Sequence, residues 1–247
     1  MIGCKCSVCT SSDPRNRRTR TSVIISCRGK CILIDSTPEL RLQCLANNVD
    51  RVDAVLFTHA HADHIFGLDD VRRFNEMQQT SIPCYGLADT LAIIRQAFEY
   101  IFIPTQEGGG KPQIELVEVS GPFTAAGVPV TPVPVLHGQL PIFGYRIGNL
   151  AYVTDCSEIP EGSKELLRGL DVLVLGVLRR QPHETHITLD QGLSVALDLS
   201  PRQTYFVHMA HGLDHETTNR ELPPGIQLAY DGLKVEVQSS EFRVQRS

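Results

Sequence analysis

The sequence lacks the features that would direct it into a membrane or out of the cell. No apolar run approaches the roughly 18 residues that a membrane-spanning helix needs, so we expect no membrane partner. The first residues, Met1-Ile2-Gly3-Cys4, have neither the basic nor the apolar region of a signal peptide. These two absences favour a cytoplasmic protein.

Signs of a multidomain chain are also missing. There is no Ser- or Pro-rich linker, no low-complexity run and no internal repeat. The 247 residues, 42% of them hydrophobic, are enough for a large core. We therefore expect a single domain over residues 1–247.

Basic residues are fewer than acidic ones, 23 against 28. The formal net charge is -5, so the chain lacks the basic field of nonspecific nucleic-acid binders, and we do not expect nucleic acid as a partner. The one basic run, Arg15 to Arg20, is expected to be a solvated arm, with an anion contact near the site as the alternative.

Short strands and helical stretches alternate along the chain. Strands are predicted at 54–58, 128–136, 150–154, 204–208 and 233–237, among others, and helices at 88–100 and 188–199. Pro132 and Pro134 place their strand at a sheet edge or a bend. This order indicates a layered mixture of α and β.

The most informative segment is Thr58-His59-Ala60-His61-Ala62-Asp63-His64, which follows a buried strand. Four candidate ligands lie within six residues, and imidazole and carboxylate suit zinc, manganese or iron. A chance surface cluster is the alternative. The strand before the segment and the further candidates downstream favour a metal site.

This segment, His59-x-His61-x-Asp63-His64, is similar to the signature motif of the metallo-β-lactamase superfamily. The other family motifs are matched, each at the end of a strand, by Asp35, His137, Asp155 and His208. The resemblance implies an α/β fold, the four-layer αββα sandwich.

The resemblance also implies a site with two divalent ions, zinc or manganese, with iron also allowed. One ion would be held by His59, His61 and His137, and the other by Asp63, His64 and His208. Asp155 would bridge the two ions, and Asp35 would orient the histidine segment by hydrogen bonds.

A second metal site is indicated by the spacing of Cys4, Cys6 and Cys9. Three thiolates so close together favour one shared zinc in a reducing compartment over disulfides, and His211 is the candidate fourth ligand. Reduced cysteines near a flexible terminus are the alternative. This pairing resembles the PhnP-like phosphoribosyl cyclic phosphate phosphodiesterases, which implies a structural zinc on Cys4, Cys6, Cys9 and His211.

The same branch carries a histidine near the substrate, and His186 matches that position. It is expected to be a general acid or a phosphate contact, with His183 as a competitor, whereas His215 is expected at the surface. Relatives begin with a strand before the cysteine motif, so we leave open whether the N-terminal strand of this chain is truncated.

The expected activity is hydrolysis of a small phosphodiester, a class that includes cyclic phosphates, with Asp63, Asp155 and His186 as catalytic residues. The alternatives are a thioesterase or a ribonuclease of the same superfamily, and a non-catalytic accessory protein resembling pyrroloquinoline quinone biosynthesis protein B. The sequence leaves the substrate, the native metal and a homodimer open.

Overall fold

The structure is a computed structural model that describes residues 1–104 and 110–237. It has the mixed α/β fold with two sheets and helices that the sequence predicts. The chain divides into two compact units: residues 20–132, and residues 1–19 together with the chain from Val133 onward. Whether they make one domain stays a prediction.

The unit of residues 20–132 contains a five-stranded sheet in the order β1-β2-β3-β4-β5. Its strands are β1 (Val23–Cys27), β2 (Lys30–Ile34), β3 (Ala54–Leu56), β4 (Ile82–Gly86) and β5 (Ile114–Glu118). Only β1 and β2 are antiparallel, and the other neighbours are parallel. The carboxyl ends of β2 and β3 therefore meet at one edge.

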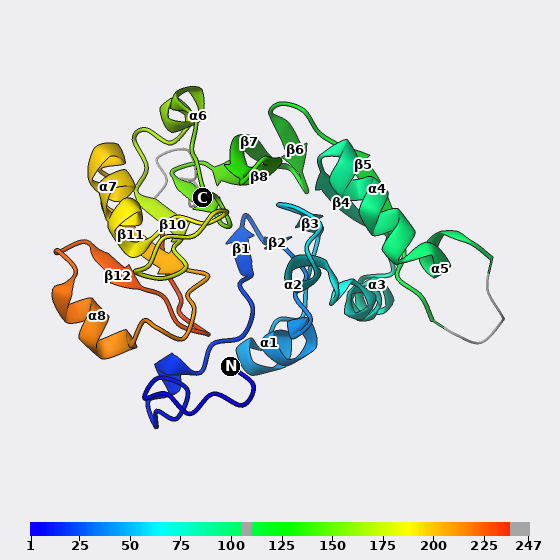
Figure 1. The fold of residues 1–247 in the computed structure, drawn as a ribbon. Coiled ribbons are helices and arrows are strands. Elements are labelled where there is room, and N and C mark those ends of the chain that lie inside the picture. The colour runs from blue at the N-terminus through cyan, green and yellow to red at the C-terminus, as the bar shows by residue number, and fades with distance from the viewer. Residues whose placement is uncertain (105–109, 238–247) are drawn as a thin grey trace, which may run out of the picture. The chain divides into compact units, whose positions relative to one another are not determined.

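Helices pack on this sheet. They are α1 (Leu40–Asn47), α2 (Ala62–Ile65), η2 (Leu68–Val71), α3 (Arg72–Gln78), α4 (Ala88–Ala97) and α5 (Glu99–Phe102). Figure 1 shows α4 lying along β4 and β5. Every residue of β3 is fully buried, because apolar side chains cover both faces of a central parallel strand.

A second sheet has seven strands in the order β12-β11-β10-β9-β8-β7-β6, of which β8 to β12 and the end of β7 belong to the other unit. The strands are β6 (Phe123–Ala125), β7 (Val128–His137), β8 (Leu140–Ile147), β9 (Leu150–Val153), β10 (Val172–Gly176), β11 (Gln203–Val207) and β12 (Ile226–Leu228). Strands β9 to β12 run parallel, so their carboxyl ends share an edge. The helices of this unit are η1 (Pro14–Asn16), α6 (Glu161–Leu166), α7 (Leu189–Leu199) and α8 (His215–Glu221).

The prolines of β7 lie where the sequence places them, at a local edge. Strand β6 pairs only with Val128 to Val130, so Pro132 and Pro134 lie beyond its last partner and need not donate to it. The helix predicted over 188–199 is also present as α7, and it begins with a capping box in which Thr188 and Gln191 bond each other's backbone.

Two predictions in this unit are wrong. Residues 233–237 form no strand, and the chain instead adds the short strand β12 beside β11. His215 is buried rather than at the surface, because its ring packs against Tyr230 and its Nε2 contacts the Asn219 amide at 3.0 Å.

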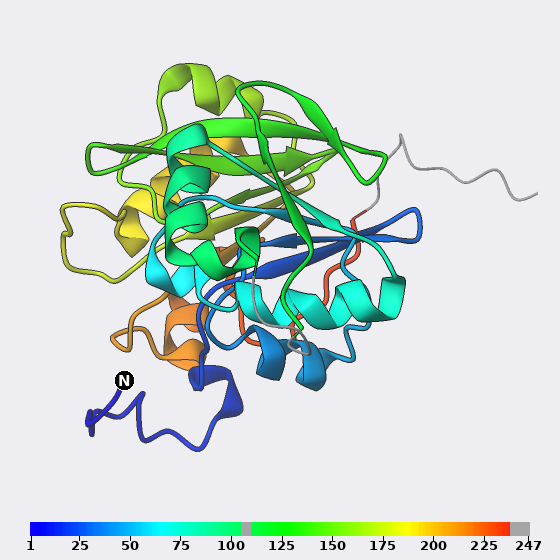
Figure 2. The same ribbon diagram turned by 90° about the vertical axis from the view of Figure 1, so that its right-hand side faces the viewer.

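The basic run is not the solvated arm that the sequence predicts. Asn16 is buried and donates to Asp214 at 2.8 Å, while Arg15 pairs with Asp13 and Glu216. Arg18 donates to the Leu213 carbonyl at 2.7 Å. Figure 2 shows this dark-blue segment beside the orange helix α8. The arm is therefore held by acceptors on the loop that leads into that helix.

Among the described residues, none of the helices has the length and apolar character that crossing a membrane requires.

Candidate metal centre

The histidine segment follows β3 and runs into α2, so a buried strand fixes its start and a helical turn fixes its end. His59 and His64 are buried, and their ring centroids lie 4.2 Å apart. His61 is exposed, with its ring 4.5 Å from that of His59. The structure thus gathers three imidazoles at the carboxyl end of one strand, with Asp63 3.6 Å from His64.

Asp35 is the hub of this segment. It follows β2, is fully buried, and its Oδ2 lies 2.8 Å from His64 Nδ1 and accepts from the Thr58 hydroxyl at 2.8 Å. Its Oδ1 accepts from the Thr58 N–H at 2.8 Å. Burial raises the pKa of the Asp35 carboxyl, and the bonds from His64 and Thr58 oppose that rise. The expectation that Asp35 orients the segment is confirmed.

These bonds determine which ring nitrogens carry hydrogen. The Thr58 hydroxyl donates to Asp35, so it accepts from His59 Nδ1 at 3.0 Å. His64 Nδ1 donates to Asp35. In its neutral form each of the two histidines therefore carries hydrogen on Nδ1 and a lone pair on Nε2, which is the tautomer that a metal ligand needs.

A glycine lets α2 pack closely against the start of α1. A Cβ on Gly67 would lie 1.9 Å from the Thr37 carbonyl oxygen, and Gly67 N–H donates to Ser36 O at 2.9 Å. Ser36 N–H in turn donates to His64 O at 2.8 Å. The ligand-bearing turn is thus fixed to the residues beside Asp35.

In the other unit, candidate ligands follow three strands. His137 ends β7, Asp155 comes two residues after β9, and His208 directly follows β11. His208 Nε2 lies 3.2 Å from Asp155 Oδ2, and the Thr154 hydroxyl donates to Asp155 Oδ1 at 2.6 Å. Because β9 and β11 are both parallel to β10, their ends bring Asp155 and His208 together.

Three of these residues have a left-handed backbone. The φ angles are 62° at Asp35, 55° at Asp155 and 57° at His208. Non-glycine residues adopt such angles at a cost of about 1–2 kcal/mol, and residues held there concentrate at functional sites. Here the bend lies just beyond a strand end and directs each side chain to its partner.

His186 joins the second group. It lies in the loop before α7, and its Nε2 is 3.3 Å from Asp155 Oδ2. Its ring is nearly parallel to that of His208, at 11° and 5.1 Å between centroids. Ligand atoms of His137, Asp155 and His186 lie within 4.8 Å of one another. The structure thus brings the predicted His186 to the predicted Asp155.

The cysteine site has the predicted composition. Ligand atoms of Cys4, Cys6, Cys9 and His211 lie within 4.8 Å of one another, with His211 Nδ1 3.3 Å from Cys4 Sγ and 3.4 Å from Cys6 Sγ. The Cys9 N–H and the His211 ring lower the pKa of the Cys6 thiol to about 6. All eight cysteines are free, and a Cys₃His set fits tetrahedral zinc.

Sequence reasoning missed the threonines. Thr58 and Thr154 directly precede His59 and Asp155, and each bonds a functional side chain. The carbonyl of Thr185 accepts from His137 Nδ1 at 2.7 Å, which leaves the His137 lone pair on Nε2. The Thr directly before two of the strand-end candidates, His59 and Asp155, was a signal in the sequence.

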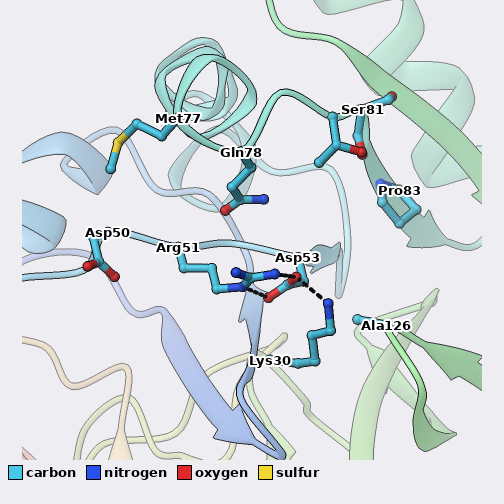
Figure 3. Close-up of a pocket in the computed structure, with 10 residues that line it drawn as sticks. Lys30, Asp50, Arg51, Asp53, Met77, Gln78, Ser81, Pro83 and Ala126 are labelled. Atoms are coloured by element: carbon cyan, nitrogen blue, oxygen red, sulfur yellow. Dashed lines mark hydrogen bonds and ion pairs between the residues drawn. The ribbon is translucent and has the colours of Figure 1, made fainter.

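A cavity of about 670 Å³ lies at the opposite edge of the five-stranded sheet. Figure 3 shows Lys30 and Arg51 both reaching Asp53 there, at 3.1 Å and 2.7 Å. Because Lys30 begins β2, while Asp35 follows its end, this cavity is at the amino edge, away from the histidine segment. Its two cations are already paired with the Asp53 carboxylate.

The sequence and fold of this chain are similar to those of known proteins. The family model described as "Beta-lactamase superfamily domain" matches residues 30–209. A solved structure described as a new diphosphatase from the PhnP family is 47% identical, covers 96% of this chain and 92% of that one, and has a TM-score of 0.90.

Two curated relatives are longer than this chain, which covers half of their length or less. An octanoyltransferase of Porphyromonas gingivalis is 36% identical over 98% of this chain and 50% of its own length. A ribonuclease Z of Clostridium kluyveri is 40% identical over 56% of this chain and 46% of its own. The chain spans about half the length of the curated relatives it matches, or less.

Proposed function

Because the chain belongs to the β-lactamase superfamily, in its PhnP-like branch, and has the fold of its metal-dependent hydrolases, we propose that it hydrolyses a small phosphodiester. The observation that carries the proposal is the donor set, in which His59, His64 and His137 each have their lone pair on Nε2. The diphosphatase relative supports a phosphate ester or anhydride as the substrate class.

We propose that the family ligands hold two divalent ions as the motifs imply. His59, His61 and His137 would hold one, Asp63, His64 and His208 the other, and Asp155 would bridge them. Such ions supply an acidified water and neutralise charge in an in-line displacement at phosphorus. We further propose that Cys4, Cys6, Cys9 and His211 bind a structural zinc. Both proposals fit the chemistry of the donors.

The protein's own residues would orient the metal-binding imidazoles and supply the proton for the leaving group. Asp35 and Thr58 hold the rings of His64 and His59, so these imidazoles need no reorientation when they bind. His186 Nε2, beside Asp155, would donate its proton to the leaving oxygen as a general acid. Asp63, on the first turn of α2, completes the proposed catalytic set.

The test measures hydrolysis of bis(p-nitrophenyl) phosphate and of a diphosphate diester with added manganese, with and without chelator. We expect turnover that chelation abolishes, and that Asp155→Ala loses together with its bound metal. Asp50→Ala, which removes an exposed carboxylate, is the matched control and keeps full turnover. Full activity in metal-loaded Asp155→Ala would contradict the proposal.

A second candidate is hydrolysis of an acyl ester or thioester, which the octanoyltransferase relative favours. An octanoyl thioester is therefore included in the same assay. Faster, chelator-sensitive turnover of this substrate than of either phosphate compound would replace phosphodiester hydrolysis as the assigned activity. A ribonuclease is disfavoured by the net charge of -5.

A further inference from the structure

Three candidate ligands converge within one compact unit. His137 ends β7, Asp155 follows β9, and His186 lies in the loop before α7, all in the chain from Val133 onward. Their ligand atoms lie within 4.8 Å of one another, and the rings of His137 and His186 meet edge to face with centroids 4.7 Å apart. This triad is therefore complete without any residue of the unit formed by 20–132.

The contacts of the triad direct donor atoms toward one point. His137 Nδ1 donates to the Thr185 carbonyl, so the His137 lone pair is on Nε2. The Thr154 hydroxyl donates to Asp155 Oδ1 at 2.6 Å, and Asp155 Oδ2 lies 3.3 Å from His186 Nε2. Two imidazole nitrogens and one carboxylate oxygen, with a water in the open position, suit a divalent first-row metal ion.

Thr185 serves both histidines of the triad. Its carbonyl accepts from His137, and its hydroxyl lies 2.9 Å from His186 Nδ1. A Cβ on Gly138 would lie 3.1 Å from Thr185 Cγ2, so the glycine allows this close approach. Histidines that bind metal characteristically have such a partner on the ring nitrogen that faces away from the ion.

The Thr185 hydroxyl also lets His186 change its tautomer, because a hydroxyl can donate or accept. Without metal, the hydroxyl donates to His186 Nδ1, and Nε2–H donates to Asp155 Oδ2. When an ion binds Nε2, the hydrogen moves to Nδ1 and the Thr185 oxygen accepts it. The hydroxyl hydrogen then turns to His183 Nδ1, 3.3 Å away. The His186 ring stays neutral, so no proton is gained or lost.

We propose that His137, Asp155 and His186 form a loading site, which binds one divalent transition-metal ion before the histidine segment contributes its ligands. The inference rests on the proposed function only for the later step. Because His137 and Asp155 also belong to the proposed two-ion site, the two arrangements exclude each other. When two ions are bound, His186 is released and its Nε2 again carries hydrogen, as general-acid catalysis requires.

The first test measures the affinity for the first Mn²⁺ ion, from the electron paramagnetic resonance signal of the free ion. Thiolates bind Mn²⁺ weakly, so the cysteine site does not contribute. We expect His186→Ala to weaken the first ion at least about 10-fold, as loss of a partner of a metal ligand already does. His61→Ala, which removes an exposed ligand of the histidine segment, should weaken only the second ion.

Glu184→Ala, at an exposed position of the same loop, is the matched control and should bind both ions as wild type does. An unchanged first ion in His186→Ala would overturn the loading site. So would an equal weakening of the first ion in His61→Ala and His186→Ala.

Two variants of Thr185 leave His186 in place, so they decide the question even if His186→Ala fails to fold. Thr185→Val keeps the shape and the carbonyl but lacks the hydroxyl, and should weaken the first ion about 10-fold. Thr185→Ser keeps the hydroxyl and should bind as wild type does. Equal affinities of these two variants for the first ion would contradict the proposal.

A second measurement counts the bound imidazoles. Cobalt shifts the N–H protons of coordinated histidines far outside the usual range of a proton NMR spectrum. At one equivalent of Co²⁺, with zinc on the cysteine site, we expect two such exchangeable signals, and one in His186→Ala. An identical spectrum in His186→Ala would show that His186 is no ligand.

None of these measurements uses turnover. If the first ion binds through His186 but the protein hydrolyses no phosphodiester, the loading site stands and the proposed function falls. A phosphodiesterase whose first ion binds independently of His186 would give the reverse result.

Discussion

At the scale of single residues, one buried carboxylate governs two imidazoles. Asp35 accepts from His64 directly and from His59 through the Thr58 hydroxyl. A carboxylate can accept all of these bonds, whereas an amide has one acceptor oxygen and presents N–H groups on its other side. The charge and shape of this one side chain therefore determine the tautomers of His59 and His64.

We predict that Asp35→Asn lowers metal affinity about 10- to 100-fold, because the amide favours a His64 tautomer with hydrogen on Nε2. Metal titration under competition with a chromogenic chelator measures this. Asp50→Asn, which changes an exposed carboxylate in the same unit, should leave the affinity unchanged. Equal affinities of Asp35→Asn and wild type would show that the hydrogen-bond hub is dispensable.

The sequence was sufficient to identify the ligand-type residues, because histidines and aspartates after apolar strands form a recognisable series. It could not identify the hydrogen-bond partners that set their tautomers. Asp35 lies 29 positions before His64, and Thr185 lies 48 positions after His137. Asp35 and His64 become neighbours because the parallel strands β2 and β3 align their ends, whereas Thr185 reaches His137 from the loop before α7.

At the scale of elements, the N-terminal arm depends on Asn16. Its amide donates to Asp214 and Ser11, and its oxygen accepts from the His215 N–H at 2.9 Å. These bonds fix the arm to the start of α8, near the proposed zinc ligand His211.

Asn16→Ala should therefore lower the free energy of unfolding by about 1–3 kcal/mol, because it leaves buried donors and acceptors unsatisfied. Urea denaturation at fixed zinc concentration is the measurement. Arg17→Ala, at the adjacent exposed position, should change it by less than about 0.5 kcal/mol. A similar loss in both variants would indicate a general effect of the arm.

A second element-scale prediction concerns Asp53, which precedes β3. Burial opposes ionisation, but bonds from Arg51, the Cys31 N–H and Lys30 outweigh it and lower the pKa of Asp53 to about 2. The unfolded value is about 3.9. This depressed pKa therefore stabilises the fold above about pH 4, and the stabilisation is lost as the pH falls from 4 toward 2.

Asp53→Asn should lower the stability at pH 7 by about 1 kcal/mol, since both cationic partners are partly exposed. Its acid-unfolding curve should also be flatter than that of wild type between pH 4 and 2. Asp50→Asn provides the comparison. If the two curves have the same slope, Asp53 does not titrate as its contacts indicate.

Helices and strands with a clear hydrophobic periodicity or a capping motif were predictable from the sequence, whereas short elements without such a pattern were not. Thr188 and Gln191 marked the start of α7 in the sequence, and the structure has it there. Strand β12 has only three residues and its pairing with β11 depends on tertiary contacts, so the sequence pattern favours residues 233–237 instead. Charge alone predicts a solvated arm for the basic run. The sequence could not show otherwise, because the acceptors that hold the run lie about 200 positions away.

At the scale of the whole molecule, the proposed sites should differ in how firmly they hold metal. Elemental analysis should give about three ions per chain, one of which resists mild chelation because thiolates bind zinc tightly in a closed shell. Cys6→Ser should lose that ion and keep the other two. If Cys6→Ser loses every ion, the sites are not independent.

The fold class was predictable because the motif order is a property of the family, and the match over residues 30–209 confirms it. The substrate was not predictable, because its recognition depends on loop conformations that no periodic pattern encodes. Relatives that match this chain are named for different activities, among them diphosphatase and ribonuclease Z, so membership of the family does not determine the substrate.

The left-handed backbone at Asp155 and His208 has a consequence for directed evolution. At both positions glycine would suit the main chain better than the native residue. A library selected only for heat resistance should therefore accumulate these replacements, each gaining about 1 kcal/mol in the metal-free protein. Such a screen would find its easiest improvements at two of the proposed metal ligands, so selection for metal binding must accompany it.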